Sequence, residues 1–230
     1  MLIKFLKNKL IKEPTNNYIY NKFKDYTMID KELFLSNISL VSNHFKHNRD
    51  LLNVIECGVW RGGMIAAIAE VLGNQHHYFL FDSFEGLPNA NEIDGVAASK
   101  WQKNINSPIF YDNCKAEESY AIDAMQKAQI SNYQIYKGWF ENTVPLFSEK
   151  KIEISVLRLD GDWYDSTMVC LDYFYPLVKR NGLIIIDDYF AWDGCSIAVH
   201  DYLSKIRSKS RIKTEKHLTY IIKNEDGRIL

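Results

Sequence analysis

The stretch "GLIIIDDYF" (residues 182–190) places Leu183 and three isoleucines directly before two neighbouring acids, Asp187 and Asp188. Such an uninterrupted apolar run is typical of a strand that is buried on both faces of a parallel sheet. Two adjacent carboxylates repel each other and gain nothing from a buried core. A salt bridge would account for one of the two acids, whereas a bound cation would account for both.

The same pattern occurs three more times in the chain. The short apolar runs "LLNVIE", "YFLFD" and "ISVLRLD" end at Glu56, Asp82 and Asp160. Segments with helical spacing separate them, which predicts βαβ units and a doubly wound, mostly parallel sheet with helices on both faces. Because ligands bind beyond the carboxyl ends of the strands in such sheets, we expect these acids and Asp187 to share one functional edge.

The rest of the chain fits this alternation. Residues 1–48 predict an N-terminal helical arm or cap, and residues 49–230 predict the α/β domain. Gly73 is expected to end the first helix of the domain and Ser166 to cap a later one. We expect further strands at 133–138 and 218–223, and helices at 62–73, 166–178 and 195–206.

Composition argues against several protein classes. The formal net charge of -1 argues against a general nucleic-acid binder. The four cysteines form no C-x-x-C pair, so we expect neither zinc nor a disulfide framework, and a reducing cytoplasm as the setting. The N-terminal "MLIKFLKNKLIK" lacks the features of a signal peptide, and no run is long enough for a membrane span. We expect this arm to pack on the domain or to join a second copy of the chain, with a membrane surface or an acidic partner as the alternative.

The turn after the first strand, "ECGVWRGG" (56–63), contains glycines but not the G-x-G-x-x-G of a dinucleotide site. Glu56 would repel a phosphate there, but it would suit a ligand with an ammonium or sulfonium charge. Gly58, Gly62 and Gly63 would let the backbone approach that ligand closely. A tight turn that carries a surface glutamate is the alternative interpretation.

Asp82 stands at the end of the second strand, where an acid commonly binds both ribose hydroxyls of an adenosine ligand. Its alternative role is to cap the following turn, "DSFEGLP". Together, Glu56 and Asp82 indicate an adenosine ligand with a positive tail and no phosphate. S-adenosylmethionine has these properties, whereas NAD does not.

A carboxylate cluster is expected if the strands at 154–160 and 183–187 are neighbours. Asp160 would then lie close to Asp187 and Asp188, and crowding would raise the pKa of each carboxyl. A divalent cation would remove most of that penalty, and all-oxygen ligands suit Mg²⁺, Mn²⁺ or Ca²⁺. The alternative is that Asp162 or Asp188 caps a helix and the cluster is smaller.

A metal beside a methyl donor suggests a mechanism. Two adjacent hydroxyls of an acceptor would chelate the ion, which lowers the pKa of one of them. A carboxylate would take the proton while the oxygen attacks the methyl group. Asp160 is the best candidate base because it adjoins the metal, and His200, one helix beyond Asp188, is the rival.

Several stretches resemble the macrocin O-methyltransferase family (TylF/MycF-like methyltransferases): "ECGVWRGG", "FDSFEGLP", "KGWFENTVP", "LRLDGDWYDST", "YPLVKRNGLIIIDDY" and "GCSIAVHDY". They run in the family's order over roughly residues 50 to 202. The resemblance implies a Rossmann-like class I methyltransferase fold that uses S-adenosylmethionine and Mg²⁺ (or Mn²⁺). A departure is that Ser196 and His200 stand where the family often has Arg and Asp.

The resemblance also assigns roles to residues by position. It implies cofactor binding by Thr27, Met28, Glu56, Gly58, Val59, Trp60, Asp82 and Ser83, and metal binding by Asp160, Asp187 and Asp188. Asp160 would also act as the base. The acceptor would lie under the N-terminal part and the 89–112 loop, with Trp101, Tyr111 and Trp192 either stacking on a sugar or serving as ordinary packing.

The leading hypothesis is therefore a metal-dependent O-methyltransferase that acts on a hydroxyl of a sugar or glycan-type small molecule. A catechol-type O-methyltransferase is the second hypothesis, since the metal chemistry is the same. A non-catalytic S-adenosylmethionine-binding protein is the third, and the intact set Asp160, Asp187 and Asp188 argues against it.

Overall fold

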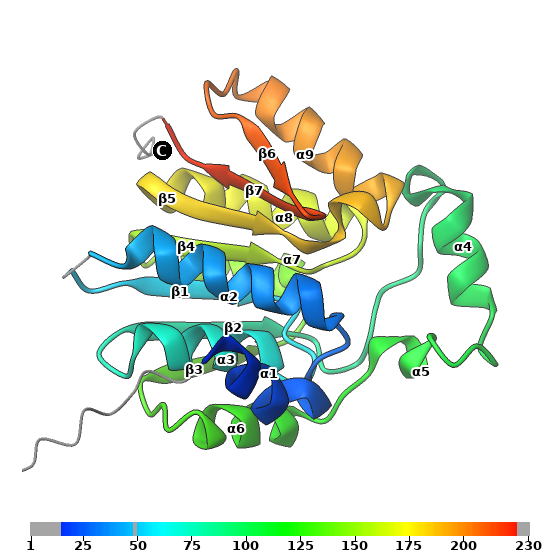
Figure 1. Ribbon diagram of the computed structural model, residues 1–230. Helices are drawn as coiled ribbons and strands as arrows, with labels where there is room; N and C mark the ends of the chain where they lie inside the picture. The colour runs from blue at the N-terminus through cyan, green and yellow to red at the C-terminus, as the bar shows by residue number, and fades with distance from the viewer. Residues whose placement is uncertain (1–14, 48–49, 225–230) are drawn as a thin grey trace, which may run out of the picture.

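A computed structural model describes residues 15–47 and 50–224 of the chain. Within them lies a seven-stranded sheet in the order β3-β2-β1-β4-β5-β7-β6 (Figure 1). Strands β1 to β5 pair in parallel, and β7 is antiparallel to both of its neighbours. The strands are β1 (Asn53–Cys57), β2 (His77–Asp82), β3 (Tyr133–Lys137), β4 (Ile154–Leu159), β5 (Val178–Ile186), β6 (Ile212–Glu215) and β7 (Leu218–Ile222). The predicted doubly wound, mostly parallel sheet is confirmed.

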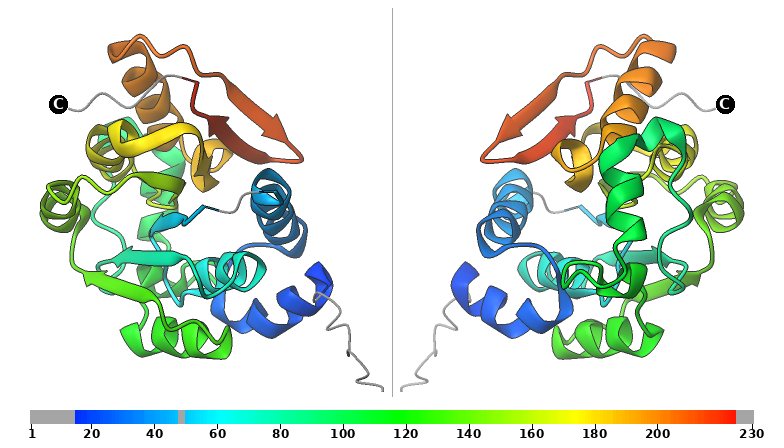
Figure 2. Two further views of the ribbon diagram at one scale, coloured as in Figure 1. Left: turned by 90° about the vertical axis from the view of Figure 1, so that its left-hand side faces the viewer. Right: turned by 90° about the vertical axis from the view of Figure 1, so that its right-hand side faces the viewer.

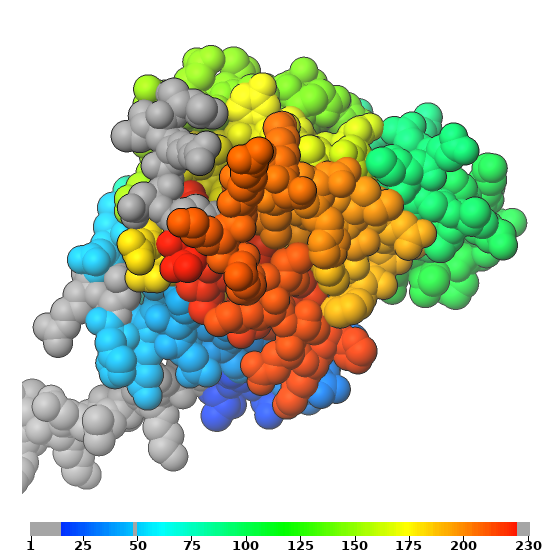
Figure 3. Space-filling view, turned by 90° about the horizontal axis from the view of Figure 1, so that it is seen from above, coloured from blue at the N-terminus to red at the C-terminus, as the bar shows by residue number. Residues whose placement is uncertain are grey.

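Helices cover both faces of the sheet (Figures 1 and 2). One face carries α1 (Asn16–Phe23), α2 (Lys31–Phe45), α3 (Gly63–Leu72) and α6 (Glu118–Lys127). The other carries α7 (Phe140–Ser148), α8 (Tyr164–Phe174) and α9 (Asp193–Lys205). The segment with α4 (Gly95–Lys103) and α5 (Tyr111–Cys114) projects from the edge toward which the parallel strands point. Seen from above, this segment forms a lobe at one end of the molecule (Figure 3).

The apolar run of β5 is divided between the two faces, as strand geometry requires. Leu183 and Ile185 pack in the cluster under α1, α2, α3 and α6. Ile184 and Ile186 pack in the cluster under α7, α8 and α9. Full burial of each such side chain contributes about 1.5–3 kcal/mol, so this strand anchors both halves of the core.

The start of α8 differs from the prediction. Ser166 lies inside the first turn rather than at its cap, and the capping position belongs to Trp163, whose side chain makes no capping hydrogen bond. Instead, Asp94 Oδ1 accepts a hydrogen bond from the backbone N–H of Tyr164 at 2.7 Å. Asp94 is distant in sequence, so its role as a substitute cap could not be read from local spacing. The predicted helix end at Gly73 is confirmed, because its N–H donates to the carbonyl of Ala69.

The described part of the N-terminal region packs on the sheet. Ile19, Phe23, Phe34 and Ile38 of α1 and α2 are fully buried in the cluster that contains α3. The lysine-rich stretch 1–12 lies outside the described residues, so contact of that arm with a second copy stays a prediction. None of the described helices is both long and apolar enough to cross a membrane.

Gly58 occupies the place where the turn after β1 passes the end of β4. Its φ is +87°, a left-handed value, and a Cβ added there would lie 1.7 Å from the carbonyl oxygen of Asp160. A hydrogen bond from Asp160 N–H to the carbonyl of Cys57 holds these two backbones together, and Gly58 N–H donates to the carbonyl of Phe81 on β2. A side chain at position 58 would therefore force the two loops of the functional edge apart.

We predict that Gly58→Ala lowers the free energy of unfolding by about 2 kcal/mol or more, since it combines strain at φ with a backbone clash. Chemical denaturation measures this change. Gly161→Ala is the matched control, because its φ is not left-handed and its Cβ would meet the Phe140 ring at 3.1 Å, a side chain that can shift. Equal stability of the two variants would contradict the predicted close approach.

Candidate functional site

A cavity of about 380 Å³ opens beyond the carboxyl ends of the parallel strands. All eleven residues that the sequence analysis assigned to a site line it: Thr27, Met28, Glu56, Gly58, Val59, Trp60, Asp82, Ser83, Asp160, Asp187 and Asp188. The fold thus gathers segments that are up to 161 residues apart in sequence into one concave surface. Their individual roles stay predictions, which the contacts below make more specific.

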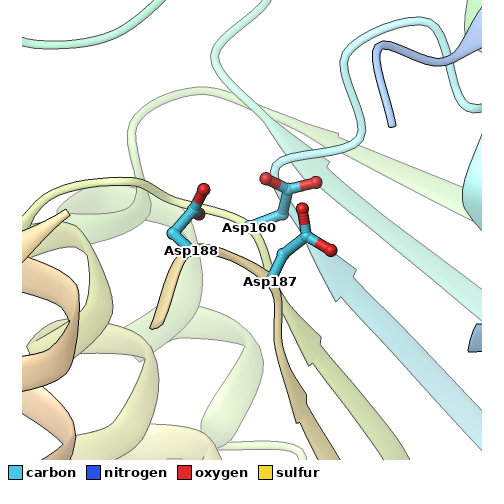
Figure 4. A group of neighbouring side chains, drawn as sticks. All are labelled: Asp160, Asp187 and Asp188. Carbon is cyan, nitrogen blue, oxygen red and sulfur yellow. The ribbon is translucent and has the colours of Figure 1, made fainter. Parts of the chain in front are cut away.

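The three predicted metal acids lie together (Figure 4). One carboxylate oxygen from each of Asp160, Asp187 and Asp188 lies within 4.8 Å of the others. The cause is the pairing of β4 with β5, in which Leu159 stands opposite Ile186, so the next residue of each strand emerges at the same edge. The condition set by the sequence analysis, that these two strands are neighbours, is met.

An arginine that the sequence analysis did not assign lies at the centre of this edge. Arg158 of β4 is fully buried. Its Nη1 donates to Glu56 Oε1 at 2.5 Å and to Asp160 Oδ2 at 2.7 Å, and its Nη2 donates to Asp187. The two neighbouring acids therefore differ, because Asp187 has the salt bridge while Asp188 makes no ion pair with a described residue.

Glu56 is a buried residue, so the alternative of a surface glutamate is wrong. Its side chain is 2% exposed, and burial raises its pKa to about 8 against the lowering effect of Arg158. Oε1 pairs with Arg158, whereas Oε2 is buried and has no hydrogen-bond partner among the described residues. An ammonium group in the cavity would satisfy this oxygen and keep the carboxylate ionised. The residue therefore fits the positive tail of the predicted cofactor.

Asp82 and Ser83 connect the turns at this edge. Asp82 Oδ2 accepts the N–H of Trp60 at 2.8 Å, and Oδ1 accepts the N–H of Phe84 at 2.7 Å. The structure thus shows the turn-capping role of Asp82 that the sequence offered as an alternative. Each carboxylate oxygen can accept a second hydrogen bond, so this role is compatible with ribose binding. The Ser83 hydroxyl donates to the carbonyl of Gly86 within the same turn.

Asp160, Asp187 and Asp188 each accept a hydrogen bond from another residue through one carboxylate oxygen. Asp160 Oδ2 and Asp187 Oδ1 bind Arg158, and Asp188 Oδ2 accepts the backbone N–H of Asp162 at 3.0 Å. Their three other oxygens accept no hydrogen bond from a described residue. Burial raises the pKa of Asp187 to about 6, against the opposing charge of Arg158. An all-carboxylate set with three unpaired oxygens fits Mg²⁺, Mn²⁺ or Ca²⁺ rather than a metal that prefers nitrogen or sulfur.

Asp162 is a further carboxylate of the cavity, which the sequence analysis considered only as a helix cap. Its Oδ1 accepts the indole N–H of Trp192 at 2.8 Å, and burial raises its pKa to about 8. It caps no helix, because α8 begins only at Tyr164. Its position two residues after Asp160 was the one available signal.

His200, the rival base, does not reach the cavity. It lies exposed on α9, where its Nε2 forms a hydrogen bond with the hydroxyl of Tyr189 at 2.9 Å. It is not among the described residues that line the cavity. The helix that carries it presents Cys195, Ala198 and Val199 to the core, which turns His200 to the outside.

An aromatic wall closes one side of the cavity. The rings of Trp101, Trp163 and Trp192 contact one another with centroids 5.2–6.3 Å apart. Trp101 and Trp192 line the cavity, as does Tyr111, so packing and exposure to a ligand are combined. The indole N–H of Trp163 donates to Pro88 at 2.9 Å, which ties the projecting segment to the loop that carries Asp160.

Comparisons with known proteins agree with this fold. The sequence profile of the macrocin-O-methyltransferase (TylF) family matches residues 10–217. The chain is 30% identical over 159 residues to demethyldecarbamoylnovobiocin O-methyltransferase of Streptomyces niveus, covering 66% of this chain and 58% of that protein. It is 29% identical over 157 residues to mycinamicin III 3''-O-methyltransferase of Micromonospora griseorubida, covering 65% and 59%. The chain therefore spans somewhat more than half the length of these relatives.

Solved structures show the same architecture. The O-methyltransferase NovP superposes with a TM-score of 0.71 at 25% identity, over 87% of this chain and 83% of NovP. The calicheamicin methyltransferase CalS11 superposes with a TM-score of 0.65 at 16% identity, over 94% of this chain and 87% of CalS11, which supports the fold alone. The fold is thus the class I methyltransferase fold predicted from the sequence. With the match over residues 10–217, the chain belongs to the macrocin-O-methyltransferase (TylF) family.

Proposed function

We propose that this protein is an S-adenosylmethionine-dependent O-methyltransferase that requires Mg²⁺ or Mn²⁺ and methylates a hydroxyl of a sugar or glycan-type acceptor. The observation that carries the proposal is the division of acids within one cavity. Glu56 offers a buried oxygen without a partner, and Asp160, Asp187 and Asp188 offer a separate group of three. The names of the two relatives describe O-methylation of demethyldecarbamoylnovobiocin and of mycinamicin III, and support the reaction class.

Donor binding is assigned to the turns after β1 and β2. Glu56 Oε2 would accept hydrogen bonds from the ammonium of the methionine part, and Asp82 would accept them from the ribose hydroxyls. Gly58 lines the cavity with its backbone, and the absence of a side chain makes room for the backbone of Asp160 beside it. Thr27, Met28, Val59, Trp60 and Ser83 complete the cofactor wall of the cavity.

Asp160, Asp187 and Asp188 would hold the divalent cation through the oxygens that the protein leaves unpaired. The bound ion would supply Lewis acidity beside the acceptor hydroxyl, which lowers the pKa of that hydroxyl. Placement of the acceptor oxygen in line with the methyl group would provide much of the rate enhancement. A cavity carboxylate would take the hydroxyl proton while the acceptor oxygen takes the methyl group from the sulfonium sulfur, which leaves S-adenosylhomocysteine as the second product.

Asp160 is the proposed base, with Oδ1 as the atom that has no protein partner among the described residues. The same oxygen would also hold the ion, which lowers its basicity. Asp162 is the alternative because it lines the cavity and makes no ion pair with Arg158. Turnover of Asp162→Asn at saturating Mg²⁺ distinguishes the two carboxylates, since this variant keeps all three metal acids.

The charge of the cavity favours an acceptor without negative charge. No lysine, arginine or histidine is found among the described residues that line it, whereas the acids are Asp30, Glu56, Asp82, Glu141, Asp160, Asp162, Asp187 and Asp188. A diphosphate group would find no lysine, arginine or histidine among the described residues of this surface, and only the bound ion and the cofactor would offset its negative charge. A neutral glycoside would instead bind through its hydroxyls and against the rings of Trp101 and Trp192. A catechol-type diol is the second candidate, because the same rings could stack on a flat aromatic acceptor.

A methyl-transfer screen tests the proposed function. Neutral glycosides, nucleotide sugars and catechols are incubated with S-adenosylmethionine, and release of S-adenosylhomocysteine is measured with Mg²⁺ and with excess EDTA. We expect turnover with neutral glycosides, little with nucleotide sugars, and full loss in EDTA that added Mg²⁺ restores. Full activity in EDTA would reject the metal's role, and preference for catechols would select the second candidate.

Two variants should separate donor binding from metal binding. Glu56→Gln removes the charge that pairs with the ammonium. It should lower the affinity for S-adenosylhomocysteine about tenfold or more, as expected for a lost charge-assisted hydrogen bond. Asp188→Asn should abolish metal-dependent turnover while changing that affinity less than about threefold, because Asp188 does not contact Glu56 or Arg158. Isothermal titration measures the S-adenosylhomocysteine affinity of each variant. NAD serves as the negative control, because we expect no binding of it. Tight NAD binding, or an unchanged affinity in Glu56→Gln, would reject the donor site.

A further inference from the structure

We propose that Arg158 is a positioning residue shared by the cofactor site and the metal site. A single buried guanidinium orients Glu56 toward the cofactor and, with its other contacts, orients Asp160 and Asp187 toward the metal. The proposal rests on the proposed function, since it assigns those two ligands to the cavity. It predicts that one substitution behind the cavity wall changes the affinities for both ligands.

The place of Arg158 in the sheet explains why it can serve two sites. Arg158 lies in β4, between β1 and β5, in register with Glu56 on one side and Ile185 on the other. Asp160 follows on its own strand, and Asp187 follows the end of β5. The three acids therefore approach the guanidinium from three adjacent strands, and Asn37 of α2 lies at the far side, 3.5 Å from Nε. Arg158 does not itself line the cavity.

The contacts use the shape of the guanidinium. Nη1 donates to both Glu56 and Asp160, and Nη2 donates to Asp187, so each acid has one oxygen fixed. The second oxygens of these acids, Glu56 Oε2, Asp160 Oδ1 and Asp187 Oδ2, are the atoms assigned to the cofactor and the metal. A planar fork of N–H donors is needed to fix three carboxylates at once, and the compact ammonium of lysine has no such geometry. Arg158 thus selects which oxygen of each acid is available.

Three carboxylates lie so close together here that they need a positively charged side chain in contact with them. Glu56, Asp160 and Asp187 form no ion pair with a described residue other than Arg158. Without the guanidinium, three crowded carboxylates would repel one another and would turn apart or take up protons. Either response removes the arrangement that the cofactor and the metal are proposed to bind. A purely structural arginine would instead affect folding and leave the affinities of the folded protein unchanged.

The test uses the full chain in four forms: wild type, Arg158→Lys, Arg158→Gln and Lys223→Met. Mn²⁺ affinity is measured by electron paramagnetic resonance, and S-adenosylhomocysteine affinity by isothermal titration. We expect both Arg158 variants to lower the affinity for each ligand about tenfold or more. Titration distinguishes this loss of affinity from partial unfolding, because unfolding lowers the number of binding sites but not the affinity of the sites that remain.

Lys223→Met is the matched control. Lys223 is also fully buried, and its Nζ donates to the carbonyls of Tyr175, Pro176 and Val178, none of which lines the cavity. This variant should melt at a lower temperature than wild type while both affinities stay within about twofold. If Arg158→Gln behaves in the same way as Lys223→Met, the proposal is wrong and Arg158 only supports the fold.

A second comparison leaves Arg158 in place, in case its variants do not fold. Asp187→Asn and Asp188→Asn each remove one charge from the metal group, but only Asp187 contacts Arg158. Without its contact to Asp187, the guanidinium is free to shift and positions Glu56 less firmly, so Asp187→Asn should weaken S-adenosylhomocysteine binding at least threefold and Asp188→Asn should not. Equal effects of the two variants would contradict the shared role. Failure of the wild-type chain to bind either ligand would instead reject the proposed function.

Discussion

The functional edge of this protein depends on one buried guanidinium placed among carboxylates of three strands. Fully buried Arg158 pairs with Glu56, Asp160 and Asp187, whose mutual repulsion is screened less in this largely buried position than in bulk water. Burial of a charged group is costly unless it is paired and hydrogen-bonded, and here each of the three acids meets that condition through the same residue. The ends of β1, β4 and β5 are held in one arrangement as a result.

The consequence is an edge with two different acidic surfaces. On the side of β1, Glu56 presents one oxygen to the cavity, near the turn where Gly58 passes against the backbone of Asp160. On the side of β5, Asp188 is free of the guanidinium and is held by the backbone of Asp162. The proposed cationic nucleoside and divalent ion would bind side by side on these two surfaces, each beside acids that have one oxygen fixed by the protein. In the proposed reaction, the acceptor hydroxyl beside the ion would then lie next to the methyl group of the cofactor, as an in-line transfer requires.

The projecting segment is tied to the same edge. Asp94 caps α8, and Trp163 bonds to Pro88, so the loop that carries Asp160 is held directly by the segment that covers the cavity. The aromatic wall of Trp101 and Trp192 rests on these contacts. Changes in the position of the covering segment are therefore expected to reach the carboxylate cluster of Asp160, Asp187 and Asp188 through a few hydrogen bonds rather than through the whole fold.

The parallel sheet and the common edge of its acids could be predicted from the sequence, because alternating apolar runs and helices permit few arrangements and place the carboxyl ends of parallel strands together. The partners of these acids could not be predicted in the same way. Arg158 stands inside an apolar run, and its contacts depend on which strands lie on either side, which local spacing does not contain. The burial of Glu56, the capping of α8 by Asp94 and the outward position of His200 have the same origin: each depends on neighbours that are distant in the chain and are brought together only by packing.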